Sequence, residues 1–254
     1  MSNYNAGTLS PSTAPYSVNN YSVSSSWYDS TDVFQFSLNS TSDINVALDP
    51  INADADLQLY FDSNYNGYFD SSDTVIASST WGGTTDDTLN LADQGSGTYF
   101  AQVYYYYSSS GSVNYNLDIS ATSNYSPSNL IPKEYNVGSL DYDQTYYGYV
   151  GSSDPYEGYH SDTTDTYYFE LGLYEGVNIT LSGLSSDADI RLIQDYDSDG
   201  VVDDYEVQDY STNGGITSDS ISTDWSGNYF LQVYQFSGDT NYTLTFDHYP
   251  TTYA

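Results

Sequence analysis

The residues from Ala188 to Glu206 read ADIRLIQDYDSDGVVDDYE and join a strand-like segment to an acidic loop. Apolar and polar residues alternate from Ala188 to Leu192, which is the pattern of a strand with one buried face. Asp195 to Glu206 carries oxygen-bearing side chains at its first, third, fifth, ninth and twelfth positions. Because a hard divalent cation takes about six to eight oxygen ligands, this spacing is typical of a calcium loop. The sequence therefore predicts a calcium-binding loop flanked by strands, where an EF-hand would have helices.

The residues of this loop have distinct expected parts in binding Ca²⁺. Gly200, at the sixth position, permits the sharp turn that such loops make, and Glu206 is long enough to bind a cation through both oxygens. The predicted ligands are Asp195, Asp197, Asp199, the backbone carbonyl of Val201, Asp203 and Glu206.

The same pattern occurs earlier in the chain, from Asp62 to Asp73, with Gly67 at the sixth position. Its predicted ligands are Asp62, Asn64, Asn66, the backbone carbonyl of Tyr68, Asp70 and Asp73. The two loops are separated by a fixed number of residues along the chain. The same number separates residues 54–57 (DADL) from 187–190 (DADI) and residues 32–36 (DVFQF) from 165–169 (DTYYF). Matches at one spacing indicate a duplicated unit. An acidic glycine turn that binds no ion and only connects two strands is the alternative for both loops.

The duplicated unit defines the expected domains. Further matches, such as residues 97–104 with 227–234, extend each copy to the usual size of one folding domain. Short segments rich in β-branched and aromatic residues recur between clusters of Gly, Ser, Asn and Asp, as in a sandwich or jelly roll. We therefore expect an all-β chain of two tandem antiparallel β-sandwich, jelly-roll-like domains. Their predicted bounds are 1–122 and 135–254, with a linker at 123–134 that is rich in Ser, Asn and Pro.

The order of motifs in each copy resembles the bacterial pre-peptidase C-terminal domain. In the second copy the order runs from residues 165–169 (DTYYF) through 187–190 (DADI) and the acidic loop to 227–234 (GNYFLQVY) and 241–244 (NYTL). The resemblance covers nearly the whole chain. It implies a small, calcium-associated β-sandwich that is not itself catalytic and that occurs beside secreted peptidases or in extracellular and surface proteins. This chain carries no peptidase domain, and its twelve-residue loops are more elaborate than the family pattern.

Composition indicates where such a protein would work. The formal net charge is −33, from 35 acidic residues against two basic ones, so nucleic acid and anionic membrane surfaces are poor partners. No apolar run is long enough for membrane insertion. Cysteine is absent, so calcium is the expected crosslink in place of disulfides. We expect a secreted, extracellular or cell-surface protein, although the first residues lack the layout of a secretory signal and export would need another route.

Tyrosine is the second anomaly in composition, with 32 residues among 254. Repeat-matched strand positions predict that Tyr99, Tyr167, Tyr229 and Tyr242 belong to the cores. Among Tyr105, Tyr107, Tyr146, Tyr147, Tyr149 and Tyr159, some are expected to be exposed. Exposed tyrosines provide contact area at protein interfaces and can stack on sugar rings.

The sequence argues against an enzyme. Nucleophilic catalysis needs a positioned base, and only His160 and His248 are available, both in polar surroundings. The strongest carboxylate clusters are already explained as cation ligands, and two distant histidines without cysteine make a zinc site improbable. We therefore expect no catalytic site and no cofactor other than Ca²⁺.

Three functions fit these features. The first is a secreted calcium-binding structural protein that self-assembles into a filament, surface layer or matrix, with its own copies as partners through strand edges and tyrosine-rich faces. The segment 1–17 is an expected donor to a neighbour's sheet. The second is a carbohydrate-binding or adhesive module with an extracellular polysaccharide as partner. The third is a pair of accessory, non-catalytic domains of a secreted hydrolase.

Overall fold

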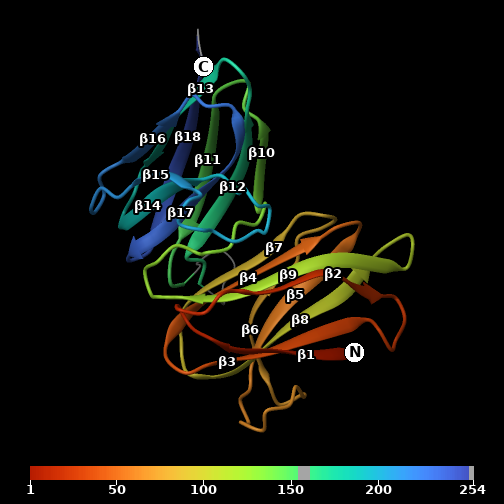
Figure 1. Cartoon of the computed structure of the whole chain (residues 1–254). Coiled ribbons are helices and arrows are strands. Elements are labelled where there is room, and N and C mark those ends of the chain that lie inside the picture. Colours follow the sequence, from red (N-terminus) through yellow and green to blue (C-terminus); the bar gives the residue numbers. More distant parts are fainter. Residues whose placement is uncertain (154–160, 252–254) are drawn as a thin grey trace. The chain divides into compact units, whose positions relative to one another are not determined.

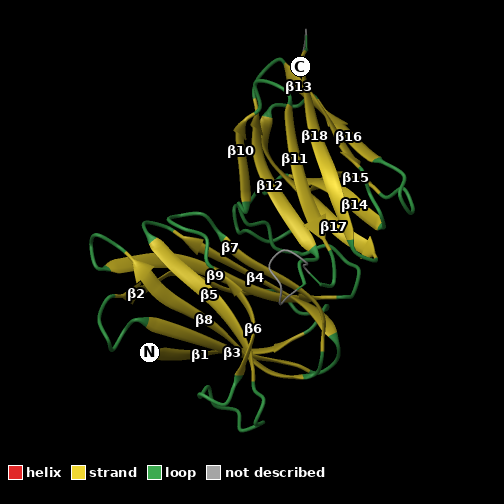
Figure 2. Ribbon diagram, turned by 180° about the vertical axis from the view of Figure 1, so that it is seen from behind, coloured by secondary structure: helices red, strands yellow, loops and turns green. Residues whose placement is uncertain are grey.

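The computed structural model describes residues 1–153 and 161–251, and the chain divides into two compact domains, Met1–Asn124 and Tyr125–Ala254. Strands and loops make up both domains, and the described residues include no helix (Figures 1 and 2). None of them therefore forms a helical segment long and apolar enough to cross a membrane. The prediction of an all-β chain with two sandwich domains is confirmed.

The first domain consists of a five-stranded sheet and a four-stranded sheet (Figure 1). The five-stranded sheet has the order β1 (Ser2–Leu9), β3 (Thr31–Leu38), β8 (Gly97–Tyr107), β5 (Asp54–Phe61) and β6 (Thr74–Ser79). The four-stranded sheet has the order β2 (Tyr16–Ser24), β9 (Ser112–Thr122), β4 (Ser42–Pro50) and β7 (Asp87–Gln94).

The second domain repeats this arrangement. Its five-stranded sheet has the order β10 (Tyr135–Ser139), β12 (Thr164–Leu171), β17 (Gly227–Ser237), β14 (Asp187–Ile193) and β15 (Val207–Ser211). Its four-stranded sheet has the order β11 (Gln144–Val150), β18 (Thr240–Pro250), β13 (Glu175–Ser182) and β16 (Asp219–Thr223). Strand for strand, the two domains have the same topology, which is what a duplicated unit predicts.

One strand pair in each domain is parallel, while all the other pairs are antiparallel. β1 pairs with β3 and β10 pairs with β12 in the parallel sense, each with a bulge just before a glycine, Gly7 or Gly138. The expectation that the segment 1–17 adds to a neighbour's sheet stays a prediction, and within this chain β1 is the edge strand of its sheet. Its backbone groups already bond to β3 in their own sheet, and β2 begins at Tyr16.

Each domain has its own apolar core between its two sheets, built from alternate residues of the strands. In β5, for example, Ala55, Leu57 and Leu59 are buried together. The four tyrosines predicted as core residues, Tyr99, Tyr167, Tyr229 and Tyr242, are all buried. Alternation along each strand therefore leaves the other face free to carry polar residues.

The boundary between the two domains falls after Asn124, within the expected linker at 123–134. The part of that segment after Asn124 belongs to the second domain. Leu130 and Ile131 are buried there, and Ile131 packs with Tyr168, Ile193 and Phe230. The apolar residues within an otherwise polar stretch explain why it packs against the domain that follows.

Candidate metal centres

The first acidic loop connects β5 to β6, which lies at one edge of its sheet. Tyr65 and Gly67 adopt positive φ angles of 56° and 74°, so the chain turns sharply at the fourth and sixth positions. The buried carboxylate of Asp62 holds this turn: Asn66 N donates to Oδ1 at 3.2 Å and Gly67 N donates to Oδ2 at 2.8 Å. The loop is thus fixed at its first position by its own backbone.

The other predicted ligands of the first loop lie close together. Asn66 Nδ2 donates to Asp70 Oδ2 at 2.7 Å, and Asn64 Nδ2 lies 3.3 Å from the same oxygen. Asp73 Oδ2 accepts from Asp70 N at 2.7 Å, while its buried Oδ1 has no partner among the described residues. Tyr68 offers only its backbone to the loop, because its side chain is exposed. Hydrogen bonds from Ser72 and Asn66 hold the pKa of Asp70 below its ordinary value.

The second acidic loop connects β14 to β15 and makes the same turn. Ser198 and Gly200 have φ angles of 60° and 77°, again at the fourth and sixth positions. Ser198 N donates to Asp195 Oδ1 at 2.7 Å, and Gly200 N donates to Oδ2 at 3.3 Å. The carboxylates of Asp195, Asp197 and Asp199 each bring an oxygen within 4.8 Å of the others. This group is suited to a hard cation, since every donor is an oxygen.

Glu206, the last residue of the second loop, binds backbone groups of the loop through its buried carboxylate. Its side chain is fully buried, with Oε1 accepting from Tyr196 N at 2.7 Å and Oε2 accepting from Asp203 N at 3.0 Å. A buried carboxylate at the twelfth position therefore ties the loop's end to its second and ninth residues. Burial and the nearby charges of Asp197, Glu206 and Asp203 raise the pKa of Asp199, as expected when like charges crowd together without a cation.

Tyr205 makes contacts within the second loop, whereas Val201 links the loop to another segment of the chain. The Tyr205 hydroxyl donates to Asp197 Oδ2 at 3.0 Å, and its ring stacks on Tyr196 with centroids 6.4 Å apart. Val201 forms an isolated β-bridge with Leu130. The sequence predicted a backbone role for Val201 toward the cation, and the structure adds this pairing with a segment far away in the sequence.

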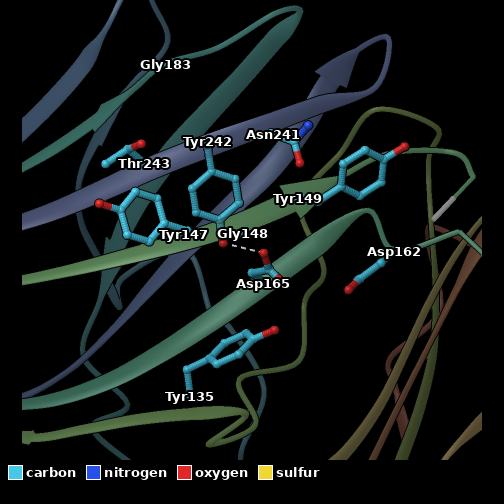
Figure 3. Close-up of a pocket in the computed structure, with 10 residues that line it drawn as sticks. All are labelled: Tyr135, Tyr147, Gly148, Tyr149, Asp162, Asp165, Gly183, Asn241, Tyr242 and Thr243. Carbon is cyan, nitrogen blue, oxygen red and sulfur yellow. Dashed lines mark hydrogen bonds between the residues drawn. The ribbon is translucent and has the colours of Figure 1, made fainter. Parts of the chain in front are cut away.

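A third group of carboxylates was missed by sequence reasoning. Oxygens of Glu134, Asp162 and Asp165 lie within 4.8 Å of one another in the second domain. Asp162 and Asp165 line a pocket of about 480 Å³ together with Tyr135, Tyr147, Tyr149 and Tyr242, and Tyr242 donates a hydrogen bond to Asp165 (Figure 3). No single spacing signals this group, because Glu134 precedes β10, Asp162 precedes β12 and Asp165 lies within β12.

Of the two histidines, the structure describes His248. Its Nε2 atom lies 3.7 Å from Glu175 Oε1. His160 lies outside the described residues, as does Tyr159.

Comparison with known proteins places part of the chain in a family. A family model of the bacterial pre-peptidase C-terminal domain matches residues 30–105. None of the curated proteins matches. Among solved structures, the pre-peptidase C-terminal domain of a Bacillus anthracis collagenase is 16% identical over 47% of this chain and 94% of its own, with a TM-score of 0.33. PliG of Aeromonas hydrophila, a periplasmic inhibitor of g-type lysozyme, is 15% identical over 45% of this chain and 97% of its own, with a TM-score of 0.31.

The family match spans β3 to β8 of the first domain, and so includes its acidic loop and the strand that precedes it. The second domain has the same strand order. The chain therefore contains a bacterial pre-peptidase C-terminal domain at residues 30–105, within the first of two domains of the same topology.

Proposed function

We propose that this chain is an exported, non-catalytic structural protein whose two domains are stiffened by calcium and self-assemble outside the cell. One observation carries the calcium part of the proposal. Both acidic loops turn at the same two positions and fix their first aspartate with the backbone N–H of the glycine at the sixth position. An acidic turn that merely connected two strands would have no reason to keep this geometry twice.

The charge balance supports a cation at these loops. A chain with a net charge of −33 repels itself, and the carboxylates of the second loop are crowded within 4.8 Å. Binding of Ca²⁺ removes this repulsion and stabilises the folded state by mass action. The oxygen-only donor set favours calcium over transition metals, which prefer nitrogen or sulfur ligands.

Exposed aromatic residues at sheet edges support self-assembly. β11 and β15 are both edge strands of the second domain. Tyr147 on β11 is 81% exposed and Tyr210 on β15 is 67% exposed. An edge strand presents unpaired backbone groups that can pair with another chain, and an exposed tyrosine beside it adds contact area.

Electron microscopy and light scattering of the full chain, with calcium and with a chelator, test this function. We expect assemblies with calcium that dissociate in chelator, and weaker assembly when Tyr147 and Tyr210 are both replaced by Ser. Tyr142→Ser is the matched control, because Tyr142 is equally exposed but lies in the loop between β10 and β11. Monomers under both conditions would contradict the proposal.

Carbohydrate binding is the second candidate, and the pocket shown in Figure 3 is the observation that favours it. Tyrosine rings and hydrogen-bonding groups such as Asn241 and Asp162 line this pocket, a combination suited to stacking on and hydrogen bonding a sugar. A glycan array distinguishes the two candidates. A specific glycan whose binding is lost in Tyr147→Ser, while the chain stays monomeric, would favour this function over assembly.

A role as the accessory part of a secreted hydrolase is supported by the match of residues 30–105 to a domain named for its place in peptidases. A peptidase encoded beside this chain, and co-purification of the two proteins, would favour that role.

A further inference from the structure

A second set of carboxylates lies at the other end of β5 from the acidic loop. Asp54 and Asp56 begin β5, while Asp87 begins β7, which belongs to the opposite sheet of the same sandwich. Asp56 is buried and Asp87 has no exposed surface at all. Asp56 and Asp62 are separated by about 20 Å of extended strand. The three acids, here called the first triad, are therefore distinct from the acidic loop.

The second domain contains the same set. Asp187 and Asp189 begin β14, and Asp219 begins β16 in the opposite sheet. Asp219, like Asp87, is 0% exposed. These three acids form the second triad. Strand pairing places Asp87 opposite Leu48 and Asp219 opposite Leu181, so the two buried acids occupy equivalent positions.

The buried acid of each triad is anchored through only one of its oxygens. Asp87 Oδ1 accepts from Ser79 Oγ at 2.5 Å and from Trp81 N at 2.7 Å. Asp219 Oδ1 accepts from Ser211 Oγ at 2.7 Å and from Asn213 N at 2.7 Å. In both domains, Oδ1 of the buried acid is thus held in the same way. One donor is the last serine of the preceding strand, β6 or β15, and the other is a backbone N–H of the turn that follows this strand.

Two further oxygens in each triad are buried without a hydrogen-bond partner, and they are the same atoms in both triads. Oδ2 of Asp87 and Oδ2 of Asp219 are buried without a hydrogen-bond partner among the described residues. Oδ1 of Asp54 and Oδ1 of Asp187 are buried without a partner as well. A buried carboxylate oxygen without a partner is costly. Its recurrence at equivalent atoms indicates a ligand that both sites share.

No basic side chain in the first domain can neutralise the first triad. The only Lys and Arg of the chain are Lys133 and Arg191, and both histidines also lie in the second domain. The Arg191 guanidinium donates to Gln232 and to the backbone oxygen of Ser128.

We propose that each triad binds one hard divalent cation of the calcium class, in addition to any ion at the acidic loops. In the first domain the ligands are Asp54, Asp56 and Asp87, with the partnerless Oδ2 of Asp87 and Oδ1 of Asp54 facing the ion. In the second domain they are Asp187, Asp189 and Asp219. The cation joins β5 to β7, or β14 to β16, and so ties the two sheets of each sandwich together. All the donors are carboxylate oxygens, which calcium prefers.

Cation stoichiometry of the full chain tests the proposal. The background for the test disables the acidic loops by Asp62→Asn, Asp70→Asn, Asp195→Asn, Asp197→Asn and Asp199→Asn. Equilibrium dialysis against calcium followed by elemental analysis counts the ions that this background still binds, whether at the triads or at the Glu134 group. Adding Asp87→Asn and Asp219→Asn is expected to lower this count by two, because Asn keeps an oxygen for Ser79 and Ser211 but loses the charge. Asp49→Asn with Asp247→Asn, both exposed, removes the same charge as a control.

Two outcomes would overturn the proposal. One is a number of bound ions that Asp87→Asn and Asp219→Asn leave unchanged. The other is a gain in melting temperature from these changes that is equal with calcium and with chelator, which would indicate that the triads share a proton instead of a cation. If the double variant does not fold, Asp54→Asn with Asp187→Asn replaces it, because these acids are less buried. Failure of the acidic loops to bind calcium would show separately, as an unchanged stoichiometry when only the loops are disabled.

Discussion

The Tyr115 hydroxyl donates a hydrogen bond of 2.7 Å to Asp32 Oδ2 and connects the two sheets of the first domain. Tyr115 lies on β9 and Asp32 on β3, and both side chains are buried. Tyr242 donates to Asp165 in the same way in the second domain. The aspartate that opens the DVFQF and DTYYF motifs therefore serves the core, as the acceptor of a buried tyrosine.

Replacing Tyr115 by Phe should destabilise the first domain by about 1–3 kcal/mol, because Asp32 Oδ2 then loses its donor inside the core. Asp32 Oδ1 already has no hydrogen-bond partner among the described residues. Urea unfolding of the full chain, followed by the transition of the first domain, measures the effect. Tyr28→Phe is the control, since Tyr28 is exposed, and an equal loss in both variants would contradict this reading of the contact.

The raised pKa of Asp32 should also make the free energy of unfolding depend on pH. Burial raises its folded-state pKa above the ordinary value, although the hydrogen bond from Tyr115 opposes the shift. The folded state therefore keeps a proton that the unfolded state has already released. It follows that the free energy of unfolding decreases as pH rises from about 4 toward the raised pKa. Asp32→Asn should flatten this decrease, as measured by thermal unfolding in chelator between acid and neutral pH. An unchanged slope in the variant would exclude Asp32 as its source.

The fold could be predicted from the sequence because its signals are local and occur twice. Alternation such as Ala55, Leu57 and Leu59 reveals a half-buried strand without any tertiary information. The turn at Gly67 and Gly200 follows from the need for a positive φ angle at the sixth loop position. Because the same motifs occur in both copies, even weak local matches together define the bounds of the two domains.

The triads and the Glu134 group could not be predicted in the same way. Asp56 and Asp87 come from β5 and β7, which belong to opposite sheets of one sandwich, and no sequence spacing encodes that arrangement. The parallel pairing of β1 with β3 was missed for the same reason, since alternation defines a strand but not its neighbour. The apolar pair Leu130 and Ile131 was a local signal within the expected linker that could have indicated its packing.

The two acidic loops should bind Ca²⁺ with different affinities. The second loop offers five carboxylates, while Asn64 and Asn66 leave the first loop with three. More ligand charge strengthens calcium binding, so we expect the second loop to bind roughly tenfold more tightly, a difference of about 1.4 kcal/mol. Asn64→Asp with Asn66→Asp should narrow the gap.

Isothermal titration of the full chain, with one loop disabled at a time, measures the two affinities. The exposed changes Asn3→Asp and Asn5→Asp add the same charge to β1 and serve as the control. Equal affinities, or a tighter first loop, would be inconsistent with ligand charge as the deciding factor.

The β-bridge between Leu130 and Val201 connects the second loop to the segment that precedes β10. Ile131 N donates to Gly200 O at 3.0 Å, and Val202 N donates to Asn129 O at 2.9 Å. Residues 129–131, near the start of the second domain, are thus hydrogen bonded to the loop positions that follow the predicted ligand Asp199. Binding at the second loop should therefore order this segment too.

Hydrogen exchange tests that coupling. Calcium should slow exchange of the Ile131 and Val202 amides by roughly tenfold or more, because both hydrogen bonds open only when the loop moves. Glu206→Gln should weaken this protection, since it removes the charge that closes the loop while keeping a side chain of the same size. The amide of Ile119, in β9 of the first domain, is the internal reference. Protection of Val202 without protection of Ile131 would falsify the coupling and confine the effect of calcium to the loop itself.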